Sequence, residues 1–141
     1  MLFASIRNHN RTILDQCGIG ALQLRALAVV RDRPDVGVSE LAKTLMIRQP
    51  SASKVVDELV SRGMLSRRAH PTDGRAIVLR LRKAGTQTLA AAPGPHWGLL
   101  PDALGRMEPS RLHRLDEALS GLLDELELKS DEASLEPLTD A

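Results

Sequence analysis

The feature that most constrains the fold of this chain is a change in its hydrophobic period at Gly63. Before this glycine, apolar residues recur every three or four positions, as they do along one face of an amphipathic helix. After it, apolar and polar residues alternate on both sides of the segment HPTDG at 70–74, which is typical of two strands joined by a turn. The pattern therefore predicts a mainly α fold with a small β-hairpin.

Three helices are predicted before the hairpin, over about residues 21–32, within 36–47, and over about 50–62. The third is well delimited, because Pro50 suits the first position of a helix and Gly63 suits its end. Only three or four residues separate the second helix from the third, a spacing that is typical of a helix-turn-helix. The hairpin would then be the wing of a winged helix-turn-helix, lying behind the third helix.

Two more helical segments follow the hairpin. A helix resumes at Ala84 and is interrupted by the segment PGPHWGLLP at 93–101. The last helix is predicted over about 109–127, and it carries six leucines on one stripe: Leu112, Leu115, Leu119, Leu122, Leu123 and Leu126. A stripe of this width needs a partner surface. Residues 128–141 have the composition of an acidic, frayed tail.

The composition supports this fold and limits where the protein is found. With one Phe, one Trp and no Tyr among 141 residues, the core has to be built from aliphatic side chains, which favours helices. The one cysteine, Cys17, cannot form an intrachain disulfide, and charged residues interrupt residues 1–20, where a signal peptide would need an apolar run. No membrane span is evident, so we expect a cytoplasmic protein.

The charge of the chain is divided between its two halves. Residues 1–83 contain 15 Lys or Arg against 7 Asp or Glu, a net charge of +8, whereas residues 84–141 contain 4 against 11, a net charge of −7. A basic half in a small protein suggests a polyanionic partner, and nucleic acid is the first candidate.

The candidate DNA-binding residues lie on the third helix and on the hairpin. Lys54 is on the outward side of the helix expected in the major groove, whereas Gln49, Ser51 and Ser53 either contact DNA or cap the helix. Arg75, just past the turn, either enters the minor groove or forms a salt bridge with Asp73 or Asp57, and both roles are compatible. The full candidate set is Arg48, Gln49, Ser51, Ser53, Lys54, Arg67, Arg68, Asp73 and Arg75. Four arginines of the hairpin lie either against phosphates or on a solvated sheet face: Arg67, Arg68, Arg80 and Arg82.

Three stretches of the chain together resemble the MarR family, the multiple antibiotic resistance regulators. They are VSELAKTL at 38–45, QPSASKVVDELVSRGMLSRR at 49–68 and PTDGRAIVLRLRKAG at 71–85, within a resemblance that covers about residues 13–127. The resemblance implies a winged helix-turn-helix homodimer that is held by its N- and C-terminal helices and binds pseudo-palindromic operators in double-stranded DNA. It also implies release by small phenolic or other lipophilic effectors. Arg82 stands where the family usually has a helix-capping Thr.

The resemblance and the periodicity together suggest a division of the chain. We expect an N-terminal dimerisation segment at 1–18, a winged helix-turn-helix domain at 19–85, C-terminal dimerisation helices at 86–127, and an acidic tail at 128–141. Trp97 either lines an effector pocket or anchors a core or an interface. Cys17 either senses oxidants or is a small buried hydrophobe.

These observations favour a sequence-specific transcription regulator, and specifically a ligand-responsive repressor that acts as a homodimer. The alternative is a winged-helix module that binds proteins and not DNA. No nucleophile elbow, phosphate loop or pair of catalytic carboxylates is evident, so an enzyme is not expected. The four histidines lack the spacing of metal ligands, and no cofactor is expected.

Overall fold

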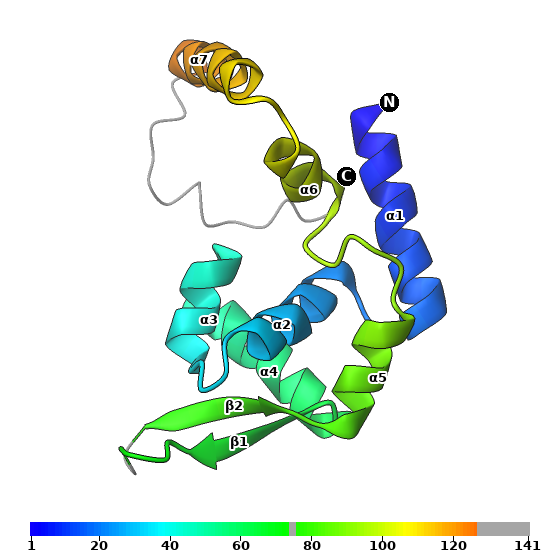
Figure 1. Ribbon diagram of the computed structural model, residues 1–141, viewed down its shortest axis with the longest axis vertical. Coiled ribbons are helices and arrows are strands. Elements are labelled where there is room, and N and C mark those ends of the chain that lie inside the picture. The colour runs from blue at the N-terminus through cyan, green and yellow to red at the C-terminus, as the bar shows by residue number, and fades with distance from the viewer. Residues whose placement is uncertain (74–75, 127–141) are drawn as a thin grey trace.

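The computed structural model describes residues 1–73 and 76–126, and Figure 1 shows their arrangement. In chain order the elements are α1 (Leu2–Cys17), α2 (Ala21–Asp32), α3 (Val38–Leu45), α4 (Gln49–Ser61), β1 (Leu65–Ala69), β2 (Ile77–Leu81), α5 (Lys83–Ala91), α6 (Leu99–Gly105) and α7 (Pro109–Glu125). The predicted mainly α fold with one antiparallel hairpin is therefore confirmed. The expected acidic tail at 128–141 lies outside the described residues.

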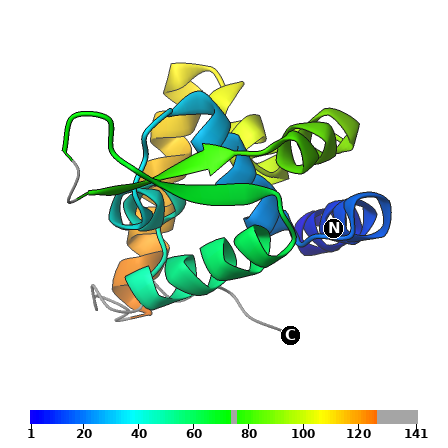
Figure 2. The same cartoon turned by 90° about the horizontal axis from the view of Figure 1, so that it is seen from below.

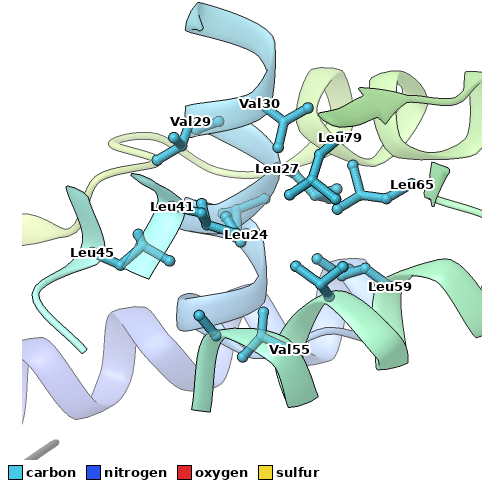
Figure 3. Close-up of a cluster of buried hydrophobic side chains, with 14 of the residues drawn as sticks. Leu24, Leu27, Val29, Val30, Leu41, Leu45, Val55, Leu59, Leu65 and Leu79 are labelled. Atoms are coloured by element: carbon cyan, nitrogen blue, oxygen red, sulfur yellow. The ribbon is translucent and has the colours of Figure 1, made fainter. Parts of the chain in front are cut away.

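The hydrophobic core surrounds α2. Every residue from Ala26 to Val30 of this helix is buried, which is typical of a helix that is covered on all sides. Leucines from α3, α4, β1 and β2 pack around it, as Figure 3 shows: Leu41, Leu59, Leu65 and Leu79. None of the described buried residues is aromatic, so the prediction of an aliphatic core is confirmed.

The turn between α3 and α4 is as short as the sequence predicted. Met46 ends α3 in the left-handed conformation, with φ 54°, and the N–H of Ile47 donates to the carbonyl of Ala42 at 3.0 Å. Arg48 then occupies the N-cap position of α4, and Pro50 lies in the first turn of the helix, where the missing N–H costs nothing. The two helices are thus joined as a helix-turn-helix.

The hairpin is held by the pairing of its two strands and by a hydrogen bond to the connection between α2 and α3. Its register runs from Leu65 opposite Leu81 to Ala69 opposite Ile77. The N–H of Leu79 donates to the carbonyl of Val36 at 2.8 Å, which attaches β2 to the connection between α2 and α3. The hairpin is therefore attached to the rest of the protein through β2.

Helix α5 crosses the base of the hairpin at very close range. The N–H of Arg82 donates to the carbonyl of Met64 at 2.9 Å, and a Cβ on Gly85 would lie 2.4 Å from the same carbonyl oxygen. Arg82 makes no side-chain cap for α5, in agreement with the loss of the usual capping Thr. Only glycine allows α5 to approach the hairpin this closely.

Helices α1, α6 and α7 lie at the end of the molecule opposite the hairpin (Figure 1). Helix α1 buries only Ile13 within the described protomer, and α7 buries no residue at all. The leucines of α7 other than the half-buried Leu115 are exposed. Across residues 1–73 and 76–126, no single helix has the length and apolarity to cross a membrane; α1 and α2 would do so only as a pair bent by 73°.

Candidate nucleic-acid interface

Helix α4 has one packed face and one open face. Ala52, Val56 and Leu59 are fully buried against the core. The open face carries the exposed residues Gln49, Pro50, Lys54, Asp57 and Ser61. In Figure 2, which views the molecule from below, α4 runs along the outer edge beside the hairpin. A helix with a complete polar face at the surface, next to a projecting hairpin, has the form of a recognition helix with its wing.

The candidate residues at the start of α4 lie together at the surface. Arg48 and Gln49 are exposed, and Ser51 and Ser53 are half-buried. The cap residue of α4 is Arg48, and no side chain caps the helix. The alternative in which Gln49 caps the helix is therefore wrong, and the serines do not cap it either.

An ion pair connects α4 to the wing. Arg67 on β1 donates from Nη2 to Asp57 Oδ1 at 2.5 Å. Asp57 was predicted to be a possible partner of Arg75, but among the described residues its partner is Arg67. Arg75 itself, with Gly74, lies outside the described residues. The pair holds a strand of the hairpin beside the open face of α4, although both side chains are more than one third exposed and the bond is screened by solvent.

The other arginines of the hairpin differ in their surroundings. Arg80 pairs with Asp35, whose backbone is left-handed with φ 71°. Arg68 and Arg82 are exposed. Of the four arginines that the sequence divided between phosphates and a solvated sheet face, two are thus engaged within the protein, because each lies within reach of a carboxylate from another element.

His70 organises the tip of the wing, a role that the sequence analysis missed. Its Nδ1 accepts hydrogen bonds from the backbone N–H groups of Thr72 and Asp73, each at 3.3 Å. The N–H of His70 donates to the carbonyl of Ala76 at 2.8 Å, which closes the loop. The available signal was a histidine at the end of a strand, directly before Pro71, where a ring nitrogen can accept from the turn that follows.

The surroundings of Cys17 disfavour a role in redox sensing. Its side chain is half-buried and packs against the core cluster. Burial raises the pKa of the Cys17 thiol, which lowers the fraction of the reactive thiolate at neutral pH. The position therefore resembles that of a small hydrophobe.

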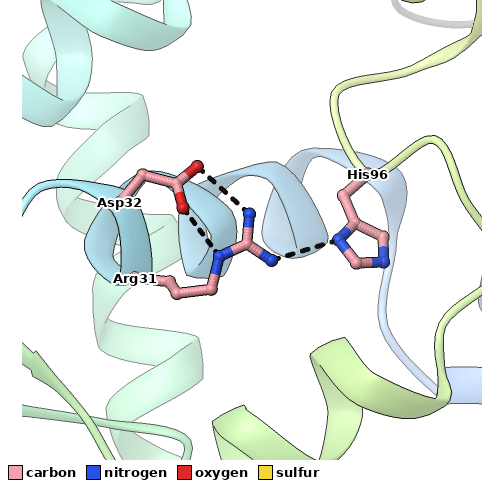
Figure 4. A network of polar contacts seen from close by, with 3 residues as sticks. All are labelled: Arg31, Asp32 and His96. Carbon is pink, nitrogen blue, oxygen red and sulfur yellow. Dashed lines mark hydrogen bonds and ion pairs between the residues drawn. The ribbon is translucent and has the colours of Figure 1, made fainter.

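Trp97 lies in the connection between α5 and α6, and its side chain is exposed. Its neighbour His96 attaches this connection to the end of α2, because Nδ1 of His96 lies 3.5 Å from Nη1 of Arg31 (Figure 4). Arg31 also binds Asp32 through two nitrogens, at 2.7 and 3.1 Å, and these hydrogen bonds lower the pKa of Asp32.

An open apolar groove lies at α6 and the first half of α7, away from Trp97. Its volume is about 610 Å³, and it is lined by Leu104, Gly105, Met107, Pro109, Leu112, His113, Leu115, Asp116 and Leu119. Trp97 is not among the lining residues, so its role in an effector pocket stays a prediction. In the part of the chain that the structure describes, no group of three His, Cys, Asp or Glu side chains is placed to bind a metal.

Comparison with known proteins places this architecture among transcription regulators. A sequence model of the MarR family matches residues 18–76. A putative transcriptional regulatory protein for the hcr operon of Thauera aromatica is 29% identical over 120 residues, which is 85% of this chain and 68% of that protein. The transcriptional repressor MprA of Escherichia coli K12 is 28% identical over 127 residues, 86% of this chain and 72% of that protein.

Solved structures agree with this placement at the level of the fold. The S. aureus MepR–DNA complex superposes with a TM-score of 0.64 at 15% identity, over 88% of this chain and 89% of that chain. Apo MarR from E. coli superposes with a TM-score of 0.55 at 19% identity, over 86% of this chain and 94% of that chain.

Proposed function

We propose that this chain is a winged-helix transcription regulator of the MarR family, a DNA-binding protein and not an enzyme. In this proposal it is a ligand-responsive repressor that binds pseudo-palindromic operators as a homodimer. The observation that carries this proposal is the open polar face of α4, with the basic hairpin held beside it by the pair of Asp57 and Arg67. The proposed units are residues 1–18 and 86–127 for dimerisation and 19–85 for DNA binding.

The proposed contacts follow the two surfaces. Helix α4 enters the major groove, where base edges can be distinguished, and brings the side chains of Gln49, Ser51, Ser53 and Lys54 with it. The phosphates are contacted by Arg48, Arg67 and Arg68. The tip of the wing, with Asp73 and Arg75, reaches the adjacent DNA backbone or minor groove. A fluorescence anisotropy titration at several salt concentrations tests this, because phosphate contacts give a steep dependence on salt. A flat salt dependence would instead favour a module that binds proteins.

Replacing Lys54 by Ala is expected to reduce sequence discrimination. The side chain is exposed on the open face of α4, and the loss of a base contact of this kind costs about 1 kcal/mol per protomer at the operator and little on unrelated DNA. The measurement is anisotropy on an operator selected from a random duplex library and on an unrelated duplex. Equal losses on both duplexes would assign Lys54 to the phosphates.

The matched variant is Arg68→Ala, on the exposed part of β1. It is expected to weaken binding to both duplexes by similar factors and to lower the slope of log K against log salt by about 2 per dimer, because each protomer loses one phosphate contact. An unchanged slope in a folded Arg68→Ala protein would remove the wing from the proposed interface.

Effector binding is expected to change the fluorescence of Trp97, the one Trp of the chain. The connection that carries it belongs to the proposed dimerisation unit, and the contact of His96 with Arg31 fastens it to α2 of the DNA-binding unit. A small phenolic or lipophilic compound that binds between the units should shift the emission and weaken DNA binding at the same concentration. A compound that releases DNA without any change in emission would place the effector elsewhere.

A further inference from the structure

We infer that Glu58 and Arg62 are positioning residues that fix the angle between the recognition helix and the dimerisation helix α1, and thereby set the spacing between operator half-sites that the protein accepts. The inference rests on the proposed function, in which α1 belongs to the dimer and α4 reads DNA. It concerns the C-terminal end of α4, where Glu58 lies one turn after Lys54 on the same side of the helix and Arg62 is the C-cap residue.

The first contact joins α4 to the beginning of α2. Gln23 donates from Nε2 to the carboxylate of Glu58, and its Oε1 accepts from the backbone N–H of Gly20 at 2.9 Å. Gln23 and Glu58 are both half-buried, so their bond is less exposed to competition by water than the ion pair of Asp57 and Arg67. The Gln23 side chain thus holds both the start of α2 and the last turn of α4.

The second contact reaches the end of α1. Arg62, one turn after Glu58, donates from Nη1 to the carbonyl of Gly18 at 2.5 Å. Gly18 is the residue that ends α1, in the left-handed conformation with φ 65°. Arg62 therefore binds one side of the short turn that joins α1 to α2, and Glu58 binds the Gln23 side chain that holds the other side.

The turn between α1 and α2 is short and rich in glycine. It consists of three residues, Gly18, Ile19 and Gly20, and glycine has more backbone freedom than any other residue. Ile19 is buried and anchors the centre of the turn. The buried Ile13 and the hydrogen bond of His9 with the carbonyl of Pro95 also hold α1 in place. At the turn itself, Arg62 and Gln23 are the side chains that bind Gly18 and Gly20, so they contribute to the direction in which α1 leaves the DNA-binding unit.

In a dimer this direction determines the separation of the two copies of α4. Each base pair inserted between half-sites moves one half-site by 3.4 Å and by about a tenth of a turn, so a dimer with stiff units tolerates little change in spacing. Loosening α1 relative to α4 should broaden the tolerated spacing and leave the contacts of each α4 with its own half-site unchanged.

The test uses the full chain and the best duplex from an in-vitro selection with the wild-type protein. Anisotropy is measured on this duplex, on versions with one or two base pairs inserted between the half-sites, and on a single half-site. Glu58→Ala removes the acceptor of Gln23 and leaves the contact between Gln23 and Gly20 in place. Glu58→Gln makes the same change in charge but retains an acceptor oxygen, so it is the matched control. Arg62→Ala tests the second contact separately, at an exposed residue.

Wild type and Glu58→Gln are expected to lose affinity steeply when base pairs are inserted. In Glu58→Ala and Arg62→Ala the ratio of the affinities for the original and the lengthened duplex is expected to be about 10-fold smaller than in the wild type, because each variant lacks one hydrogen bond to a charged group. The affinity for the single half-site is expected to be unchanged. Circular dichroism and sedimentation confirm that the variants are folded dimers, and if Glu58→Ala does not fold, Arg62→Ala decides.

Two results overturn the inference alone: an unchanged insertion penalty in a folded, dimeric variant, or an equal loss of affinity on the half-site and the full operator. A wild-type protein that binds no selected duplex above random DNA overturns the proposed function, and the inference with it.

Discussion

Leu119→Asp is expected to convert the proposed dimer into a folded monomer. Leu119 lies in the middle of the leucine stripe of α7, and 49% of its side chain is exposed in the single protomer. Burial of one leucine contributes about 1.5 to 3 kcal/mol, and a two-fold interface contains it twice, so its loss raises the dimer dissociation constant by about 10² to 10⁴. The measurement is sedimentation velocity at micromolar concentration.

The control for this variant is Arg114→Asp, which places the same carboxylate on the same helix but on the side away from the leucines. It should remain dimeric. Because α7 buries no residue within the protomer, the Leu119→Asp chain should keep its helical circular dichroism. A dimer that persists in Leu119→Asp, or dissociates equally in Arg114→Asp, would move the interface away from the leucine stripe.

Gly85→Ala is expected to lower the free energy of unfolding by about 2 to 3 kcal/mol, in the upper range for overpacking of a core. The new methyl group would lie 2.4 Å from the carbonyl oxygen of Met64 and 3.4 Å from the side chain of the fully buried Leu27. The carbonyl cannot move easily, because it accepts from the N–H of Arg82. Either α5 moves away from the hairpin or β1 is displaced. Urea denaturation followed by circular dichroism measures the change.

Gly121→Ala is the matched control, because it is also a helical glycine, and nothing lies within 4 Å of the added Cβ. This variant is expected to be neutral or to stabilise α7 by up to about 1 kcal/mol, the difference in helix propensity. A loss of stability in Gly85→Ala together with a gain in Gly121→Ala would separate the steric effect at Gly85 from the gain in helix propensity. A Gly85→Ala protein as stable as the wild type would mean that α5 does not cross the hairpin this closely.

The elements that the sequence predicted well are those with local signals. Pro50 and Gly63 delimit α4 because proline and glycine act on the backbone of their own residues, and the change of period at Gly63 marks β1 without any knowledge of what it packs against. The tight approach at Gly85 belongs to the stretch that resembled the MarR family, but its physical reason, the carbonyl of Met64, is visible only in three dimensions.

The polar contacts of the candidate site could not be predicted in the same way. Asp57 and Arg67 are 10 residues apart, and Gln23 and Glu58 are 35 apart, so each pair depends on how the helices and strands pack. Charge patterns name the residues that can pair but not the partner that each one meets. For this reason Arg67 and Arg80 were grouped with Arg68 as surface cations, although two of the three have carboxylate partners.

Those internal partners have a consequence for competition among sites on a chromosome. Affinity for unrelated DNA grows with the number of phosphates that a protein neutralises, and a genome offers about 10⁶ to 10⁹ such sites. Arg67 and Arg80 are already paired with Asp57 and Asp35, so they add less to this general attraction than unpaired arginines would. For the proposed repressor, fewer molecules would then be retained on unrelated sequence, and a smaller number of copies in the cell would be enough to keep an operator filled.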